Sequence, residues 1–322
     1  MMTILAGFDI GGTKCAVTVG RRMDHNEITL LGKVQFSTPK DPYQTITKLI
    51  SVLEQLLLEQ GGSLAAIGIS CGGPLDSKTG VILSPPNLPG WDHIPITSLI
   101  KEHFGVPVGL QNDANACALA EWRWGAGVGT RNMIFLTFGT GMGAGLILDG
   151  KLYTGTNDMA GEIGHMRLEP TGPIGYGKAG SFEGFCSGGG IVQLGRMKAA
   201  EASAIGQPPS FCQSESQLDA MTAQQIAEAA QSGDLLALQV FRTVGVQLGR
   251  GLSVLVDLLN PELIVIGSMY ARQRDLLEAF ALEELQREAL PHAHRVCRVV
   301  PAGLGELVGD YASLSVAEYQ VM

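Results

Sequence analysis

The chain has 322 residues, enough for two domains, and its 45% hydrophobic and 16% charged residues exclude an intrinsically disordered protein. The net charge of −9 argues against non-specific binding to nucleic acid or to an anionic membrane, and no apolar run approaches the roughly 18 residues of a membrane span. Six scattered cysteines without a C-x-x-C pair indicate reduced thiols and a cytoplasmic protein.

A glycine turn between two strands opens the chain. Residues 4–10 predict a buried strand, residues 11–14 a tight turn and residues 15–20 a second strand. A dinucleotide fold or a P-loop would need a helix after the glycines, and neither motif is present. The turn can still bind phosphate, because glycine-rich turns direct several backbone N–H groups into one concavity, and Asp9 could hold Mg²⁺ through water. The alternative is an ordinary hairpin.

The next elements are a helix, a strand and a rigid loop. Residues 45–60 have the apolar spacing of an amphipathic helix, and residues 65–70 predict a strand that leads into a glycine pair at 72–73. In the Pro/Gly-rich loop that follows, Asn87 could present its amide and Trp91 a flat apolar face to a polar ligand. A plain surface turn is the alternative.

Asp113 lies between two amides at a change of secondary structure. Residues 106–110 predict a strand, and a helical pattern runs from residue 114 to Trp124. A carboxylate at a strand end faces the crevice where open α/β sheets bind ligands, so Asp113 is a candidate general base. The alternative is that Asp113 or Asn112 caps the helix.

The opening pattern then recurs. Residues 133–138 predict a strand, residues 139–145 a glycine turn and residues 146–150 another strand. Two such hairpins suggest a duplicated architecture of two lobes, which could close on the phosphates of one nucleotide from both sides.

Two glutamates and a histidine follow in a glycine-rich context. Glu162, His165 and Glu183 could hydrogen-bond a polyol, since carboxylates accept hydrogen bonds from vicinal hydroxyls. A structural role is the alternative for the histidine.

The remainder is mainly helical. A capping box at Thr222 opens a helix that runs to residue 230, and residues 235–259 form a long helix with small residues on one face. Strands are predicted at 263–266 and 296–300, and a terminal helix at 304–320.

These motifs together resemble the ROK family (repressors, open reading frames and kinases). The matching segments, which extend over essentially the whole chain, are residues 9–14, 72–74, 86–91, 112–115, 139–143, 161–165, 187–188 and 259–262. The resemblance implies an α/β protein of the actin-like ATPase (ribonuclease H-like) fold, with two lobes that have duplicated β-sheet cores. We expect an N-terminal lobe over residues 1–113, completed by the C-terminal helix at 306–322, and a C-terminal lobe over residues 114–305.

The resemblance also implies a function and its residues. We expect a cytoplasmic, homodimeric kinase that uses ATP and Mg²⁺ to phosphorylate a hexose or N-acetylhexosamine at its terminal hydroxyl, with Asp113 as the base. The sugar site would be lined by Gly73, Asn87, Asn112, Glu162, His165 and Glu183. The phosphates would contact Gly11, Gly12, Thr13, Lys14, Thr140 and Gly141, and the adenosine would lie near Gly267 and Ser268.

The chain departs from the family at its zinc loop. The family usually has C-x-C-G-x-x-G-C-x-E, but residues 174–183 retain only the glycines and the glutamate. His165 and Cys186 cannot supply the four ligands of a structural zinc site, so we predict no zinc, with packing of Tyr176, Phe182 and Phe185 in its place.

Two other functions remain as alternatives. The family includes sugar-responsive repressors with an N-terminal helix-turn-helix, for which a first strand near residue 3 leaves no room. A non-catalytic sugar-sensing or regulatory protein is the second alternative, which the loss of the zinc cysteines favours and the intact Asp113 opposes.

Overall fold

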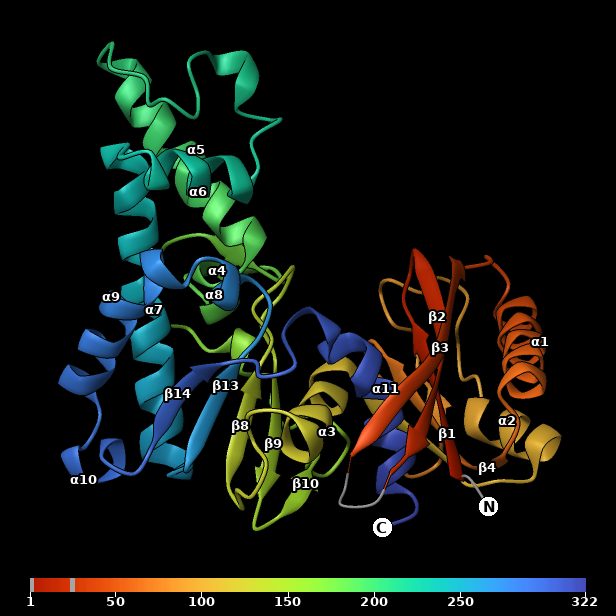
Figure 1. Ribbon diagram of the computed structural model, residues 1–322. Coiled ribbons are helices and arrows are strands. Elements are labelled where there is room, and N and C mark those ends of the chain that lie inside the picture. The colour runs from red at the N-terminus through yellow and green to blue at the C-terminus, as the bar shows by residue number, and fades with distance from the viewer. Residues whose placement is uncertain (1–2, 24–26) are drawn as a thin grey trace. The chain divides into compact units, whose positions relative to one another are not determined.

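The computed structural model describes residues 3–23 and 27–322. The chain divides into two compact units, each described by itself (Figure 1). Unit 1 comprises Met1–Phe135, Gly145–Ala160 and Ala302–Met322, and unit 2 comprises Leu136–Ala144 and Gly161–Pro301. The lobes expected from the sequence, with their boundary at residue 113, are a different division and stay a prediction.

The first sheet lies in unit 1 and has the strand order β3-β2-β1-β4-β7. Its strands are β1 (Thr3–Ile10), β2 (Lys14–Arg22), β3 (Ile28–Ser37), β4 (Ser63–Cys71) and β7 (Val108–Asn112). β1 pairs antiparallel with β2 and parallel with β4, and β4 pairs parallel with β7. The carboxyl ends of β1, β4 and β7 therefore share one edge of this sheet, where open α/β sheets bind their ligands.

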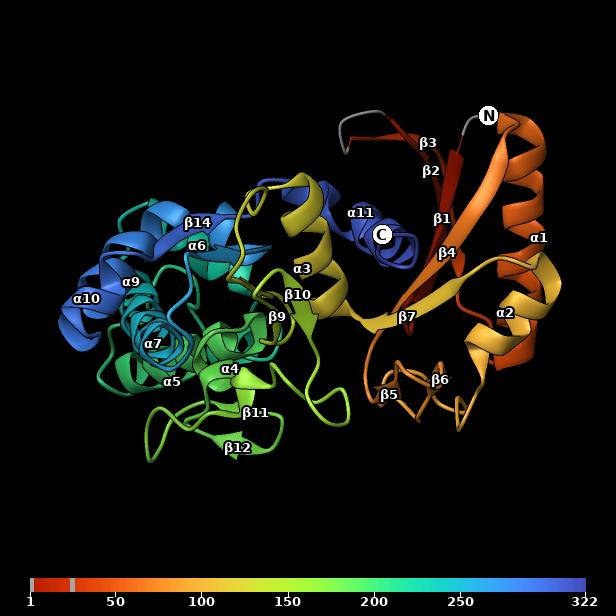
Figure 2. The same ribbon diagram turned by 90° about the horizontal axis from the view of Figure 1, so that it is seen from below.

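Helices cover both faces of the first sheet. Figure 2 shows α1 (Pro42–Gln60) and α2 (Ile96–Phe104) on one face and α11 (Val308–Tyr319) on the other. Helix α3 (Asp113–Trp124) packs against α11. α1 begins three residues before its predicted start, because Asp41 caps it, and a proline suits the first turn of a helix.

Glycines let α11 lie directly on the first sheet. A Cβ on Gly68 of β4 would be 2.0 Å from the carbonyl oxygen of Ser313, and one on Gly7 of β1 would be 2.1 Å from its Oγ. Any larger side chain would separate the helix from the sheet. The terminal helix predicted at 304–320 is observed as a 3₁₀ turn (Gly305–Leu307) followed by α11.

The second sheet has the strand order β10-β9-β8-β13-β14. Its strands are β8 (Met133–Leu136), β9 (Ala144–Leu148), β10 (Lys151–Tyr153), β13 (Leu263–Ile266) and β14 (Arg298–Pro301). β13 has the predicted limits and is fully buried.

Some predicted strand limits in this sheet are wrong. The strand expected at 146–150 begins at Ala144 and ends at Leu148, because Asp149 and Gly150, with φ of 52° and 72°, form a two-residue turn into β10. The strand expected at 296–300 begins at Arg298, after a backbone turn in which Cys297 donates to the carbonyl of His294.

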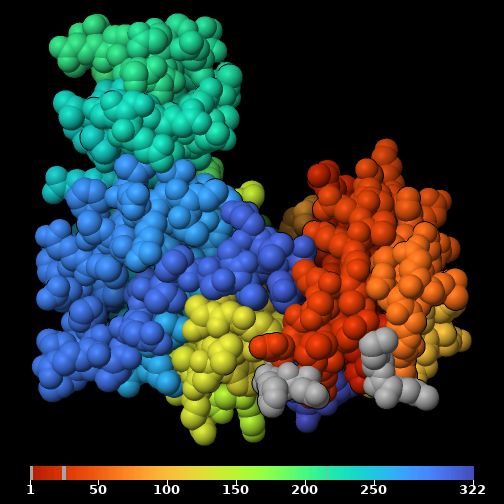
Figure 3. Space-filling model, viewed as in Figure 1, coloured from red at the N-terminus to blue at the C-terminus, as the bar shows by residue number. Residues whose placement is uncertain are grey.

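Unit 2 contains helices of very different lengths: α4 (Phe182–Phe185), α5 (Gly188–Ala204), α6 (Ala223–Gln231), α7 (Leu235–Leu259), α8 (Met269–Arg272), α9 (Arg274–Glu288) and α10 (Pro291–His294). The capping box at Thr222 is confirmed, and α7 has its predicted limits. A Cβ on Gly249 would lie 2.4 Å from the carbonyl oxygen of Ala281, so the small residues of α7 let α9 approach closely. The α5–α6 end projects from the rest of unit 2 (Figures 1 and 3).

Short elements complete the chain: β5 (Leu75–Asp76), β6 (Val81–Ile82), β11 (Ile174–Gly175), β12 (Lys178–Ala179) and the 3₁₀ helices Ile163–His165 and Glu215–Gln217. None of the helices in the described residues combines the length and the apolar character needed to span a bilayer.

Candidate active site

Asp113 is the first residue of α3 and follows directly on β7. The residue that caps this helix is Asn112, whose Oδ1 accepts a hydrogen bond of 2.8 Å from the backbone N–H of Asn115. The capping alternative therefore applies to Asn112. The carboxylate of Asp113 is left for other contacts, and the helix N-terminus favours its negative charge.

Ser70 is the hydrogen-bond partner of Asp113. Its Oγ donates to Asp113 Oδ1 over 3.3 Å from the end of β4. The Asp113 side chain is exposed, yet nearby protein atoms desolvate its carboxyl group enough to raise its pKa, which the Ser70 hydrogen bond opposes. No motif pointed to Ser70, which lies two residues before the 72–73 glycine pair. The parallel pairing of β4 with β7 brings it beside Asp113.

Asp9, at the end of β1, belongs to the same electrostatic group. Burial, reinforced by the negative charge of Asp113, raises the pKa of Asp9 to about 7, while Lys33 opposes the shift. Lys33 itself forms an ion pair with Asp310 of α11. A buried carboxylate whose proton affinity a second carboxylate raises is a setting in which a divalent cation would be stabilising. Mg²⁺ accepts one or two carboxylates and water as ligands.

The first glycine turn leaves two of its backbone N–H donors free. Gly11 donates to the carbonyl of Lys14 over 3.1 Å and accepts from Thr38 Oγ1 over 2.6 Å, which closes the turn between β1 and β2. In the described part of the chain the backbone N–H groups of Gly12 and Thr13 have no acceptor, and both residues are exposed. Such a turn fits an anionic phosphate.

The loop with Asn87 lies against this turn. A Cβ on Gly12 would be 2.2 Å from the backbone oxygen of Asn87, and one on Gly72 would be 3.2 Å from Asn87 Oδ1. The structure thus brings Gly12, a predicted phosphate contact, close to Asn87, a predicted sugar ligand, and to the 72–73 glycine pair. The expectation that Trp91 presents a flat apolar face to a ligand is wrong, because that side chain is only 1% exposed and belongs to the hydrophobic core of unit 1.

The second glycine turn, at residues 139–143, is in unit 2. Gly139 donates to the carbonyl of Gly141 over 3.1 Å, and Gly143 donates to Thr137 Oγ1 over 2.8 Å. The N–H groups of Thr140 and Gly141 meet no acceptor among residues 3–23 and 27–322, so this turn also presents free donors.

Glu183 connects the second turn to the predicted sugar-binding loop. Its Oε2 accepts from the backbone N–H of Met142 over 3.0 Å, and a Cβ on Gly164 would lie 3.2 Å from the Glu183 Cβ. The 3₁₀ turn with His165 therefore lies beside the second glycine turn. The His165 ring meets the Tyr176 ring edge-on at 5.2 Å. Phe182 and Phe185 are buried, as the packing prediction for this loop expected, whereas Tyr176 is 72% exposed and does not join the core.

The segment at Gly267 and Ser268 also lies beside the second turn. Gly267 donates to the carbonyl of Leu136 and Met269 donates to that of Phe138, each over 2.9 Å. Ser268 has a φ of 56°, a conformation that favours glycine. A cavity of about 450 Å³ opens next to this segment, with a lining of Ala223, Gln224, Ala227, Glu228, Gln231, Met269, Arg272 and Gln273.

The zinc loop lacks suitable ligands. No group of three His, Cys, Asp or Glu side chains that could hold a metal ion occurs in the described residues. Cys186 is buried and its Sγ donates to the carbonyl oxygen of Val244. The residues present do not fit a four-ligand thiolate site.

Comparisons with known proteins identify the family of this chain. The sequence profile of the ROK family matches residues 5–313. The glucokinase of Streptomyces coelicolor is 31% identical over 277 residues, which are 86% of this chain and 85% of that protein. The DNA-binding transcriptional repressor Mlc of Escherichia coli is 30% identical over 259 residues, 78% of this chain and 61% of that protein.

A solved structure extends the likeness to the fold. The ROK family glucokinase from Streptomyces griseus, in complex with glucose and AMPPNP, is 29% identical to this chain and superposes with a TM-score of 0.74. The matched region covers 99% of this chain and 100% of that one. With two five-stranded sheets in the chain, this likeness confirms the predicted actin-like ATPase fold.

Proposed function

Because this chain belongs to the ROK family, we propose that it is an ATP-dependent sugar kinase that phosphorylates a hexose or N-acetylhexosamine at its terminal hydroxyl. The observation that supports this most strongly is the setting of Asp113. Asp113 follows β7 directly, and Asn112 caps helix α3 in its place. Ser70 donates a hydrogen bond that orients one oxygen of the Asp113 carboxylate. A carboxylate held this way can accept the proton of a sugar hydroxyl.

The raised pKa of Asp113 suits a general base. Desolvation strengthens the attraction of its carboxylate for a proton, whereas the Ser70 hydrogen bond stabilises the ionised form and limits the rise of the pKa. Asp113 would take the proton from the sugar hydroxyl as the hydroxyl oxygen attacks the terminal phosphate of ATP.

The two glycine turns would hold the phosphates. Gly12, Thr13, Thr140 and Gly141 would contact them through the N–H groups that have no acceptor among the described residues, and Gly11 and Lys14 would complete the first turn around them. Asp9 would hold Mg²⁺ through water, and the cation would neutralise charge on the transferred phosphoryl group. The adenosine would lie near Gly267 and Ser268, beside the cavity between α6 and α8.

The sugar would be bound by Gly73, Asn87, Asn112, Glu162, His165 and Glu183. Glu183 gives one oxygen to Met142, which leaves its other oxygen for a sugar hydroxyl. Asn112 uses Oδ1 for the helix cap, so its amide N–H groups are the part that would face a ligand.

A second candidate is a non-catalytic sugar-sensing or regulatory protein. The likeness to the repressor Mlc favours it. A sensor would need the sugar residues and would have no use for Asp113 as a base.

Sugar-dependent ADP release distinguishes the two candidates. Purified protein with ATP and Mg²⁺ would be offered glucose, mannose, fructose, allose, N-acetylglucosamine and N-acetylmannosamine. We expect at least one sugar to raise ADP release well above the sugar-free rate. Binding of a sugar by calorimetry without any ADP release would overturn the kinase and support the sensor.

A further inference from the structure

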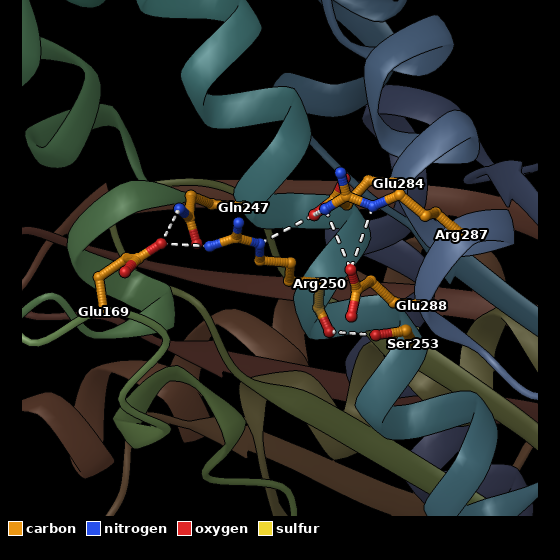
Figure 4. Close-up of polar contacts among 7 residues, drawn as sticks. All are labelled: Glu169, Gln247, Arg250, Ser253, Glu284, Arg287 and Glu288. Atoms are coloured by element: carbon orange, nitrogen blue, oxygen red, sulfur yellow. Dashed lines mark hydrogen bonds and ion pairs between the residues drawn. The ribbon is translucent and has the colours of Figure 1, made fainter.

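Arg250 on α7 joins segments that are far apart in the sequence of unit 2. Figure 4 shows its guanidinium between Glu169 and Glu284, with Gln247 beside it. Arg250 Nε donates to Glu284 Oε1 of α9 over 2.8 Å, and Arg250 Nη1 donates to Glu169 Oε1. Gln247 Nε2 donates to the same Glu169 oxygen over 3.1 Å. One residue of α7 therefore links α9 to the loop that follows the 3₁₀ turn of His165.

The backbone around Glu169 is bound to the segment that precedes Glu183. The N–H groups of Leu168 and Glu169 both donate to the carbonyl of Gly180, over 2.9 and 3.1 Å. Gly180 has a φ of 67°, and a Cβ there would lie 2.1 Å from the carbonyl oxygen of Glu169. A shift of Glu169 would therefore move residue 180 as well.

The next residue of α7 holds the other end of this segment. A Cβ on Gly251 would lie 2.3 Å from Cζ of Phe182, whose side chain is fully buried. Consecutive residues of α7 thus contact Glu169 through charge and Phe182 through packing, and the segment from 169 to 182 is held at both ends.

This segment leads into two residues of the proposed sugar site. Phe182 donates to the carbonyl of Met166 over 2.8 Å, and Lys178 Nζ donates to the carbonyl of His165 over 2.6 Å. Glu183 comes directly after Phe182 and accepts from Met142. The positions of His165 and Glu183 therefore both depend on the same segment.

We propose that Arg250 is a positioning residue, which fixes residues 169–182 so that His165 and Glu183 meet the sugar in the correct geometry. This inference rests on the proposed kinase function. The Arg250 and Glu169 side chains are 35% and 34% exposed, so their ion pair contributes little net stability on its own. Its effect is geometric, because displaced binding groups bind the sugar less well in the ground state and the transition state alike, which raises KM and retains kcat.

The test compares Arg250→Met with Arg287→Met. Arg287 also donates to Glu284, over 2.6 Å, but it does not reach Glu169, so its variant is the matched control. For Arg250→Met we expect the KM for the sugar to rise roughly tenfold while kcat stays within about twofold. Arg250→Lys should recover part of the loss, because it retains the charge without the planar fork.

Hydrogen exchange gives a readout that does not need activity. In Arg250→Met the amides of residues 168–182 should exchange faster than in the wild type, with no change in β13. Unchanged exchange of residues 168–182 would overturn the inference. Faster exchange with an unchanged sugar KM would also overturn it, as would an equal rise of the sugar KM in Arg287→Met.

If Arg250→Met does not fold, Glu169→Gln replaces it, since it keeps an acceptor for Gln247 and removes the ion pair. A wild type that phosphorylates no sugar defeats the proposed function, while the exchange result still decides the role of Arg250.

Discussion

The two glycine turns have similar composition, yet different parts of the chain hold them in place. In unit 1 the turn at Gly11 closes between β1 and β2, which pair without interruption from Ile10 and Cys15. In unit 2 the turn at 139–143 depends on Glu183, which is 41 residues from Met142, and on Gly188, which donates to the carbonyl of Gly139. The first turn therefore follows mainly from its hairpin, with one further hydrogen bond from Thr38. The second has local hydrogen bonds as well, but it also depends on residues at least 41 positions away.

Of the variants that compare the two turns, Gly12→Ala should produce the largest effect, because no side chain fits at this position of the first turn. The added Cβ would lie 2.2 Å from the backbone oxygen of Asn87, so the turn or the Asn87 loop must move. We expect kcat/KM for ATP to fall roughly 100-fold, measured by ADP release. Gly309→Ala on α11, where a Cβ meets no atom within 4 Å, should keep the wild-type value. An active Gly12→Ala enzyme would show that this turn does not hold phosphate.

Glu183→Leu tests the long-range support of the second turn. It removes the acceptor of the Met142 N–H together with a proposed sugar ligand. We expect the KM values for both sugar and ATP to rise about tenfold, the effect of losing one hydrogen bond to a charged group. Glu162→Leu should raise the sugar KM alone. An unchanged KM for ATP in Glu183→Leu would mean that the second turn keeps its conformation without Glu183.

A separate prediction concerns stability and the charge near the end of β1. Burial raises the pKa of Asp9 from 3.8 to about 7, so the folded protein retains a proton that the unfolded chain has lost between these values. The unfolding free energy should therefore decline as pH rises from 3.8 to about 7. Asp9→Asn should remove that part of the decline and be more stable than the wild type at pH 8 by about 2 kcal/mol.

Urea unfolding at pH 5 and pH 8, without Mg²⁺ or nucleotide, measures this difference. The exposed Asp149→Asn is the control and should follow the wild-type pH dependence. Parallel curves for Asp9→Asn and the wild type would contradict the raised pKa.

Local sequence predicted those features that local physics determines. The β1–β2 turn, the capping box at Thr222 and the limits of α7 follow from spacing and capping residues within a few positions. The end of β9 was predicted too late, because Asp149 and Gly150 directly follow the apolar residues 146–148 and were counted with them. In the structure Asp149 adopts a positive φ and begins a turn. Strand β3 was missed because its residues are mostly exposed or half-buried, so it lacks an apolar pattern.

The residues that surround the candidate site were harder to predict. Motifs identified Asp113, Asn87 and Glu183, which the comparisons leave as proposals. Ser70 meets Asp113 only because β4 and β7 are neighbours in the sheet, and Glu169 meets Arg250 across 81 residues. Contacts of this kind depend on tertiary packing, and spacing along one sequence does not encode them.

The most direct measurement of the central claim is sugar-dependent ADP release by Asp113→Asn, together with calorimetric titration of the same sugar. We expect kcat to fall roughly 1,000-fold, because the amide cannot accept the proton of the hydroxyl. The sugar Kd should stay within about threefold of the wild-type value, since Asn112 still caps α3 and the proposed sugar ligands remain. A kcat close to that of the wild type would contradict the assignment of Asp113 as the base.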